Sequence, residues 1–95
     1  MMKRQSNLAF NREFPVKTGL SGIPRDSGVQ LRMDTANQFD PDAVGIFLDK
    51  VEVVMGWLYR KDNNRAAVIS KLRCGGEITG HIELVDGKKV VIFWL

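Results

Sequence analysis

The sequence predicts a mainly β, β-rich α+β protein: a small closed barrel of six strands with one main helix. Its 95 residues suffice for one domain with a single modest core. Several short segments alternate apolar and polar side chains with a period of two, whereas one stretch has helical spacing. Six strands in an open sheet of this size would expose two long edges, and closure into a barrel removes them.

The N-terminal part begins with a polar, non-periodic stretch. It predicts a flexible arm over residues 1–13, followed by a single barrel domain over residues 14–95. Apolar and β-branched residues over 14–20 indicate a first strand, and the Ser, Gly and Pro residues after it indicate a loop. The alternation over residues 29–33 is typical of a half-buried strand.

The middle of the chain predicts a one-turn helix followed by two strands. Asp40 before Pro41 combines a helix-capping side chain with a residue that needs no amide donor, which indicates one helical turn near residues 40–43. Strands are predicted over 44–49 and 51–59. In the second of these strands the odd-numbered residues share one face, namely Val51, Val53, Met55, Trp57 and Tyr59.

The C-terminal third predicts the main helix and a closing hairpin. The helix is expected over residues 62–74, beginning at an Asp cap and carrying apolar residues three and four positions apart. Gly75-Gly76 ends it, because glycine takes the left-handed conformation without strain. Strands over 77–85 and 89–95 are joined by Asp86-Gly87, a dipeptide that strongly favours a two-residue hairpin turn.

The composition limits the possible functions. Hydrophobic residues make up 44% and charged residues 26%, which is ordinary for a globular domain. The longest apolar run is far shorter than the roughly 20 residues that span a bilayer, and the N-terminus lacks the apolar region of a signal peptide. One cysteine, Cys74, cannot form an internal disulfide, which favours a reducing compartment. We therefore expect a cytoplasmic protein without a membrane partner.

The sequence offers little to an enzyme or a cofactor. His81 and Cys74 are too few ligands for a structural zinc site, and no Gly-rich phosphate loop occurs. Asp34, Asp40 and Asp42 form the one acidic cluster, and a metal-dependent nuclease that uses them is a minor alternative. We expect a non-catalytic protein that uses neither a metal nor another cofactor.

Positive charge and an aromatic residue in a polar segment point to a binding function. The formal net charge is +3, and basic residues gather near 60–65, where they could meet phosphate. Phe39 either tucks under the rim of the barrel or presents a flat face to a nucleobase. Asp40 is either a cap or an acceptor for a sugar hydroxyl, since a carboxylate repels phosphate. Trp57 and Tyr59 likewise either fill the barrel or help the stacking.

Four blocks of the sequence resemble the HIRAN domain family, in the right order and spacing, over roughly residues 14–76. The segment from Asn37 to Val44 is similar to that family's Asn-Pro-Tyr-Asp-x-Asn-Ala-Val/Ile signature. Met55-Gly56-Trp57-Leu58 resembles the second block, and Asp62-Asn63-Asn64-Arg65-Ala66 resembles the start of the following helix. Val16-Lys17-Thr18-Gly19-Leu20 matches the opening strand.

The resemblance implies a modified OB-like or SH3-like barrel that binds single-stranded DNA at its 3′ end without catalysis of its own. It also implies DNA ends and larger DNA-processing enzymes as partners, because the family includes a domain of fork-remodelling translocases. Carried over, Phe39 stacks on the terminal base, Asp40 meets the 3′-hydroxyl and Asn37 shapes the end pocket. Basic residues after the second block contact phosphates. The expected DNA-binding residues are Lys17, Asn37, Phe39, Asp40, Trp57, Tyr59, Arg60, Lys61 and Arg65.

The chain departs from the family pattern in the segment from Asn37 to Val44 and in the opening strand. Gln38 stands where the family has Pro, and Asp42 where it has Asn. The second aromatic side chain, which family members present from the first strand, has Phe14 as its nearest substitute. The loss of one stacking partner costs on the order of 1–3 kcal/mol per base. The alternative function is a protein-interaction adaptor without DNA affinity, which docks peptides through an exposed edge or an aromatic groove.

Overall fold

The computed structural model describes residues 2–14, 23 and 27–95. These residues form seven strands and one α-helix, which confirms a small β-rich barrel with one main helix and one strand more than the six expected. The strands are β1 Lys3–Ser6, β2 Leu8–Phe10, β3 Gly28–Met33, β4 Val44–Leu48, β5 Gly56–Leu58, β6 Ile78–Val85 and β7 Lys88–Trp94, and the helix is α1 Arg65–Arg73.

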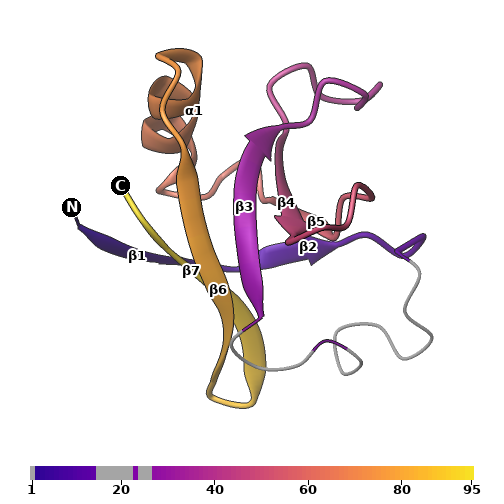
Figure 1. Ribbon diagram of the computed structural model, residues 1–95, viewed down its shortest axis with the longest axis vertical. Helices are drawn as coiled ribbons and strands as arrows, with labels where there is room; N and C mark the ends of the chain where they lie inside the picture. The colour runs from indigo at the N-terminus through magenta and orange to yellow at the C-terminus, as the bar shows by residue number, and fades with distance from the viewer. Residues whose placement is uncertain (1, 15–22, 24–26) are drawn as a thin grey trace.

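The described strands form one antiparallel sheet in the order β1-β7-β6-β3-β4-β5-β2, which closes almost completely into a barrel. Its outermost strands, β1 and β2, follow each other in the chain and are separated by Asn7. This segment pairs with β7 through its first half and with β5 through its second half. Figure 1 shows the β1–β2 segment crossing the middle of the molecule, between α1 at one end of the molecule and the β6–β7 turn at the other end.

Residues 3–10 therefore belong to the barrel, and the flexible arm predicted for this part of the chain is wrong. Leu8 is buried in the core, and Ser6 is buried as well. The Ser6 hydroxyl donates to Asp62 Oδ1 at 3.0 Å and accepts from Asn64 Nδ2 at 2.8 Å. Because serine is polar, the sequence indicates a surface position for Ser6, although its hydrogen bonds allow it to be buried. The period-two alternation of buried residues in these strands could therefore not be recognised from the sequence.

The core lies inside the barrel. Leu31 of β3, Ile46 of β4, Ile82 of β6 and Phe93 of β7 are fully buried, and each comes from a different strand. Val68 of α1 is also fully buried, so the helix covers part of the same core. Each such side chain contributes about 1.5–3 kcal/mol when it leaves water. This core fixes the positions of the loops that it carries.

The chain between β4 and α1 differs from the prediction. The strand expected over 51–59 is shortened to β5, because the chain turns after β4 at Lys50, whose φ is 65°. Met55 is fully buried although it precedes β5, whereas Trp57 is half-buried and Tyr59 is 53% exposed. The shared face predicted for these residues is therefore wrong.

Residues 40–43 form a hydrogen-bonded turn, so the predicted one-turn helix is also wrong. The Ala43 amide donates to Asp40 O at 3.2 Å, and the Asp42 amide donates to Asp40 Oδ1 at 3.0 Å. The side-chain cap expected of Asp40 is thus present. Val44 begins β4 directly afterwards, which leaves no room for a helical turn.

The C-terminal elements agree with the prediction except at the start of the helix. α1 begins at Arg65, and the residue before it is Asn64, which makes no side-chain capping hydrogen bond, so the cap predicted at Asp62 is wrong. Gly75 follows the helix, and its φ of 84° is the expected left-handed end. Asp86 and Gly87 have φ values of 51° and 77° and join β6 to β7. Among the described residues, no helix is long and apolar enough to cross a membrane. The strand predicted over 14–20 lies, beyond Phe14, outside the described residues.

Candidate nucleic-acid interface

The turn between β3 and β4 is fixed by the side chain of Asn37. Its Oδ1 accepts hydrogen bonds from the Phe39 amide at 2.8 Å and from the Asp40 amide at 2.9 Å. The Asn37 amide in turn donates to Asp34 O at 3.2 Å. Asn side chains commonly stabilise turns in this way. Asn37 therefore sets the backbone on which the Phe39 ring is carried.

The Asp40 carboxylate is engaged by two arginines. Its Oδ2 accepts from Arg65 Nη2 at 2.7 Å and lies 3.3 Å from Arg60 Nε, and its side chain is 17% exposed. Arg65 also donates to Asp42 O at 2.9 Å, and its own side chain is 15% exposed. The structure thus places Arg65 as a tie between α1 and the turn.

This environment lowers the pKa of Asp40 below its ordinary value of 3.8. The hydrogen bond from the Asp42 amide is the largest cause, because it favours the charged carboxylate. The positive charges of Arg65 and Arg60 act in the same direction, against the desolvation that raises the pKa. Asp40 is consequently ionised at neutral pH.

Phe39 points into solvent. Phe39 is 88% exposed, which is the highest value among the exposed large hydrophobic residues that the structure describes. Arg60 Nη2 donates to Phe39 O at 2.8 Å, so a second contact holds this backbone in addition to Asn37. The hypothesis that the Phe39 ring lies under the rim of the barrel is therefore wrong.

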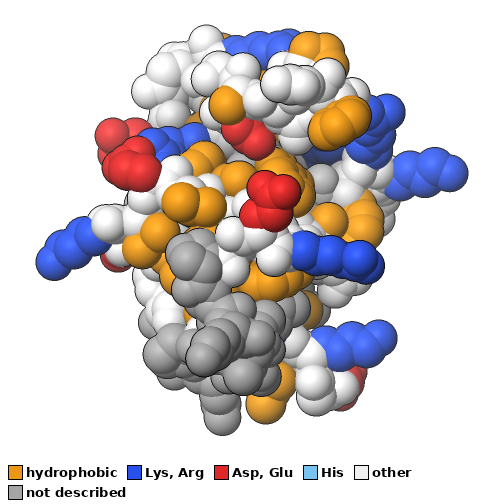
Figure 2. Space-filling view, turned by 90° about the vertical axis from the view of Figure 1, so that its right-hand side faces the viewer, with side chains coloured by type: hydrophobic (Ala, Val, Ile, Leu, Met, Phe, Trp, Pro, Cys, Tyr) orange, Lys and Arg blue, Asp and Glu red, His pale blue; other side chains and the backbone are white. Residues whose placement is uncertain are grey.

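Beside Phe39 lies a hollow of about 550 Å³, which we call the Phe39 hollow. Trp57 of β5 forms part of its wall, and Trp57 Nε1 donates to Asp34 Oδ2 at 2.7 Å. Figure 2 views the molecule from this side and shows hydrophobic side chains gathered on the face with acidic side chains among them. The hollow is lined by Asn11, Glu13, Asp34, Ala36, Asn37, Gln38, Phe39, Val54 and Trp57.

A glycine allows the strands beneath this hollow to approach each other. In β5, a Cβ on Gly56 would come within 2.6 Å of Ala9 O in β2. The two strands pair directly, with Ala9 opposite Trp57, and Gly45 of β4 faces Trp57 from the other side. Small neighbours on both sides therefore flank the Trp57 ring on the outer face of the barrel.

The charge of the Phe39 hollow is negative. Glu13 and Asp34 line it, and its described lining contains no Lys or Arg. Asp40, to which the sequence analysis gave the hydroxyl contact, is not part of this lining. Neither Glu13 nor Asp34 was among the expected DNA-binding residues. Glu13 belongs to the segment predicted as a flexible arm, and Asp34 was considered only as part of the acidic cluster of the nuclease alternative. Only the folded chain brings them beside Trp57.

The structure leaves several expected site residues elsewhere. Tyr59 lines a different hollow, and Lys61 is exposed in the turn before α1. Arg60 is 68% exposed and stays close to Phe39. Lys17 lies outside the described residues.

The acidic residues of the alternative nuclease site have separate partners. Asp34 binds Trp57, Asp40 binds Arg65, and Asp42 Oδ1 accepts from Arg73 Nη2. Over residues 2–14, 23 and 27–95, no group of three His, Cys, Asp or Glu side chains is placed to hold a metal ion.

Comparison with known proteins does not extend these findings: no family model matches the chain, and neither a curated protein nor a solved structure matches it.

Proposed function

We propose that this chain is a HIRAN-like, non-catalytic module that binds single-stranded DNA at a free 3′ end, in the cytoplasm and beside larger DNA-processing enzymes. The observation that carries the proposal is the Phe39 ring, 88% exposed on a turn that Asn37 and Arg60 both hold. An apolar ring fixed in solvent is poorly placed for folding and well placed for contact with a ligand. Stacking on a nucleobase gives it a partner worth about 1–3 kcal/mol.

The terminal base stacks on Phe39 and enters the Phe39 hollow. Trp57 offers a second aromatic surface there, because Phe14, the nearest substitute for the family's first-strand aromatic, is buried in the core. Arg60 and Lys61 stand outside the hollow and are exposed, so they can follow the phosphates behind the terminal nucleotide. Arg60 can leave Asp40 for a phosphate at small cost, because an ion pair with so exposed a partner is weak. Asn37 and Arg65 keep their hydrogen bonds to the turn when Arg60 moves.

The carboxylates of the hollow account for end recognition. Glu13 and Asp34 repel an internal phosphodiester, whereas a terminal hydroxyl carries no charge and can donate a hydrogen bond to either carboxylate. They take the role first assigned to Asp40, whose Oδ2 is occupied by Arg65 and Arg60. Asp40 instead keeps the turn in place.

The test is a fluorescence-anisotropy titration with a 5′-labelled oligothymidylate of eight nucleotides that ends in a 3′-hydroxyl or in a 3′-phosphate. We expect tighter binding of the hydroxyl form, because the phosphate adds negative charge beside Glu13 and Asp34. Asp34→Asn and Glu13→Gln should reduce the difference between the two ends. Glu77→Gln, which removes an exposed carboxylate outside the hollow, should leave it unchanged. Equal affinity of the wild-type protein for both ends contradicts end recognition.

The same hollow favours one second candidate, an adaptor for a cationic peptide. Two carboxylates beside Phe39 and Trp57 are suited to a Lys or Arg side chain, because an aromatic face attracts a cation by about 0.5–2 kcal/mol. In this case a lysine-rich peptide binds in the Phe39 hollow and quenches Trp57 fluorescence, while single-stranded DNA produces no anisotropy change even at low salt. The DNA titration therefore separates the two functions.

A further inference from the structure

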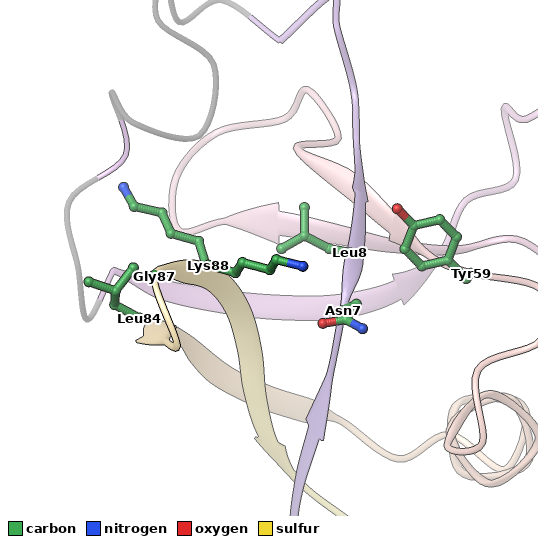
Figure 3. A pocket seen from close by; sticks show the side chains of 7 residues that line it. Asn7, Leu8, Tyr59, Leu84, Gly87 and Lys88 are labelled. Carbon is green, nitrogen blue, oxygen red and sulfur yellow. The ribbon is translucent and has the colours of Figure 1, made fainter.

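A second hollow, of about 660 Å³, lies between the start of β2 and the β6–β7 turn, and we call it the Tyr59 hollow. Asn7 and Leu8 of the N-terminal segment line it, and so does Tyr59, the residue that follows β5. Leu84 and Lys88 contribute from the opposite side. Figure 3 shows Leu8 between Tyr59 on one side and the β6–β7 turn on the other.

The side chains of the Tyr59 hollow are apolar and positively charged. Tyr59 is 53% exposed and Leu84 is 42% exposed, so both present apolar surface to solvent. Lys88 and Lys89 also line the hollow, and its described lining contains no Asp or Glu. Lys89 Nζ donates to Ile23 O and is held in place. Lys88 is exposed and forms no ion pair within the described residues, so its charge is available to a ligand.

The two hollows lie along the same pair of strands. Asn7 of the Tyr59 hollow and Asn11 of the Phe39 hollow flank β2, while Trp57 lies in β5 and Tyr59 directly follows its last residue. Extended chain covers roughly 7 Å over the two residues from Trp57 to Tyr59 and roughly 13 Å over the four residues from Asn7 to Asn11. At about 3.4 Å for each stacked nucleotide, these separations correspond to about two to four nucleotides of a single strand.

The hollows also have opposite charges. The Phe39 hollow carries Glu13 and Asp34, and the Tyr59 hollow carries Lys88 and Lys89. The 3′-terminal nucleotide has no phosphate after it, whereas each internal nucleotide has a phosphate on both sides. The negative hollow therefore suits the end of a strand, and the positive hollow suits its interior.

We infer that the Tyr59 hollow is a second single-stranded DNA subsite, in which Tyr59 stacks on a base about two to four nucleotides from the bound end and Lys88 contacts a neighbouring phosphate. This inference rests on the proposed function, and it extends the footprint from the terminal nucleotide to a short strand. It also explains why Tyr59 and Leu84 stay exposed on opposite sides of one hollow. Single-strand binding barrels combine aromatic platforms and basic grooves in this manner.

The experiment compares oligothymidylates of two and of eight nucleotides, both with a free 3′ end, binding to the full chain. Anisotropy of a 5′ label reports the longer strand, and Trp fluorescence reports the shorter one. Tyr59→Ala should weaken binding of the eight-nucleotide strand by about five-fold or more, and Tyr59→Phe, which keeps the ring, should restore it. Neither change should affect the two-nucleotide strand, because it cannot reach from the Phe39 hollow to Tyr59.

Lys88 is tested by the salt dependence of the eight-nucleotide titration. Lys88→Gln should lower the slope of log affinity against log salt by about 0.7, because one phosphate contact is lost. Lys71→Gln makes the same charge change on α1, at the opposite end of the molecule from the β6–β7 turn (Figure 1), and should leave the slope unchanged.

The outcomes distinguish this inference from the function on which it rests. Wild-type binding of DNA with unchanged affinity in Tyr59→Ala and an unchanged slope in Lys88→Gln overturns the second subsite and leaves the proposed function standing. Equal losses for the two- and eight-nucleotide strands also overturn it, because Tyr59 would then act at the end itself. A wild-type chain that binds neither strand overturns both.

Discussion

The Asp40 carboxylate joins three parts of the molecule. It accepts hydrogen bonds from the amide of Asp42 within its own turn and from Arg65 at the start of α1, and it forms an ion pair with Arg60 in the segment after β5. The Nε of Arg65 is buried and has no hydrogen-bond partner within the described residues. The Arg65 guanidinium therefore binds Asp40 and Asp42 through a terminal nitrogen and not through Nε. The turn that carries Phe39 depends on this arrangement.

Asp40 makes the stability of the protein depend on pH in a defined direction. Because the folded protein lowers the pKa of Asp40 below 3.8, the stabilisation is complete above the ordinary Asp pKa and is lost as the pH falls through the lower, folded value. Asp40→Asn should therefore be less stable than the wild type at neutral pH, and the gap should narrow below about pH 4. Urea unfolding of both proteins at several pH values measures this difference in the free energy of unfolding.

An exposed carboxylate provides the control for this prediction. Asp49→Asn removes the same charge at the end of β4, so a gap that narrows equally in both variants would reflect general charge rather than Asp40. A difference between wild type and Asp40→Asn that stays constant from neutral to acidic pH would contradict the role given to the ionised carboxylate.

At the scale of single residues, the sequence left Phe39 open between a buried and an exposed position. An aromatic residue in a polar segment fits both, because the sequence does not show whether the rim has room beneath it. The hydrogen bonds from the Phe39 and Asp40 amides to Asn37 decide the matter, since they fix the backbone so that the ring faces solvent. The turn-forming property of Asn37 could be predicted, but its consequence for the ring could not.

At the scale of elements, β1 and β2 close the barrel. Without them, β7 and β5 would each lose a hydrogen-bonded neighbour. Ser6 also links this segment to the residues before α1 through Asp62 and Asn64. The N-terminal segment is consequently required for the fold that carries both hollows.

A single substitution tests this role of β2. Leu8→Ala should lower the free energy of unfolding by about 2–5 kcal/mol, because Leu8 is buried in the core and its removal leaves a cavity. Lys3→Ala, which changes an exposed residue of β1, should shift it by no more than about 0.5 kcal/mol. Chemical denaturation followed by circular dichroism measures both variants. If Leu8→Ala were as stable as the wild type, residues 3–10 would form a dispensable arm after all.

The elements that could be predicted are those whose signals are local. Asp86-Gly87 needs only its own two residues to form the turn between β6 and β7, and Gly75 needs only its own conformation to end α1. The prediction for β5 was wrong because tertiary contacts decide the length and the buried face of this strand. The turn at Lys50 and the buried position of Met55 shorten the strand predicted over 51–59, and the buried side chain of β5 is Leu58 rather than Trp57. Tertiary contacts overrode the local pattern there.

At the scale of the whole molecule, the closed sheet gives its outer surface a gradient of charge along β2 and β5. The Phe39 hollow with Glu13 and Asp34 lies at one end of these strands, and the Tyr59 hollow with Lys88 lies at the other. The net charge of +3 gave no indication of this division. The negative hollow joins residues from the N-terminal segment, the β3–β4 turn and β5, so only closure of the barrel assembles it.

The exposed ring of Phe39 is proposed to stack on a nucleobase, and a comparison of two Phe39 variants tests this role. A 5′-labelled oligothymidylate with a free 3′ end is titrated with wild type, Phe39→Ala and Phe39→Tyr, and the thermal stability of each protein is measured alongside. We expect Phe39→Ala to bind about five-fold or more weakly with an unchanged melting temperature, since Phe39 is 88% exposed, and Phe39→Tyr to bind like the wild type. Equal affinity of Phe39→Ala and wild type would contradict it.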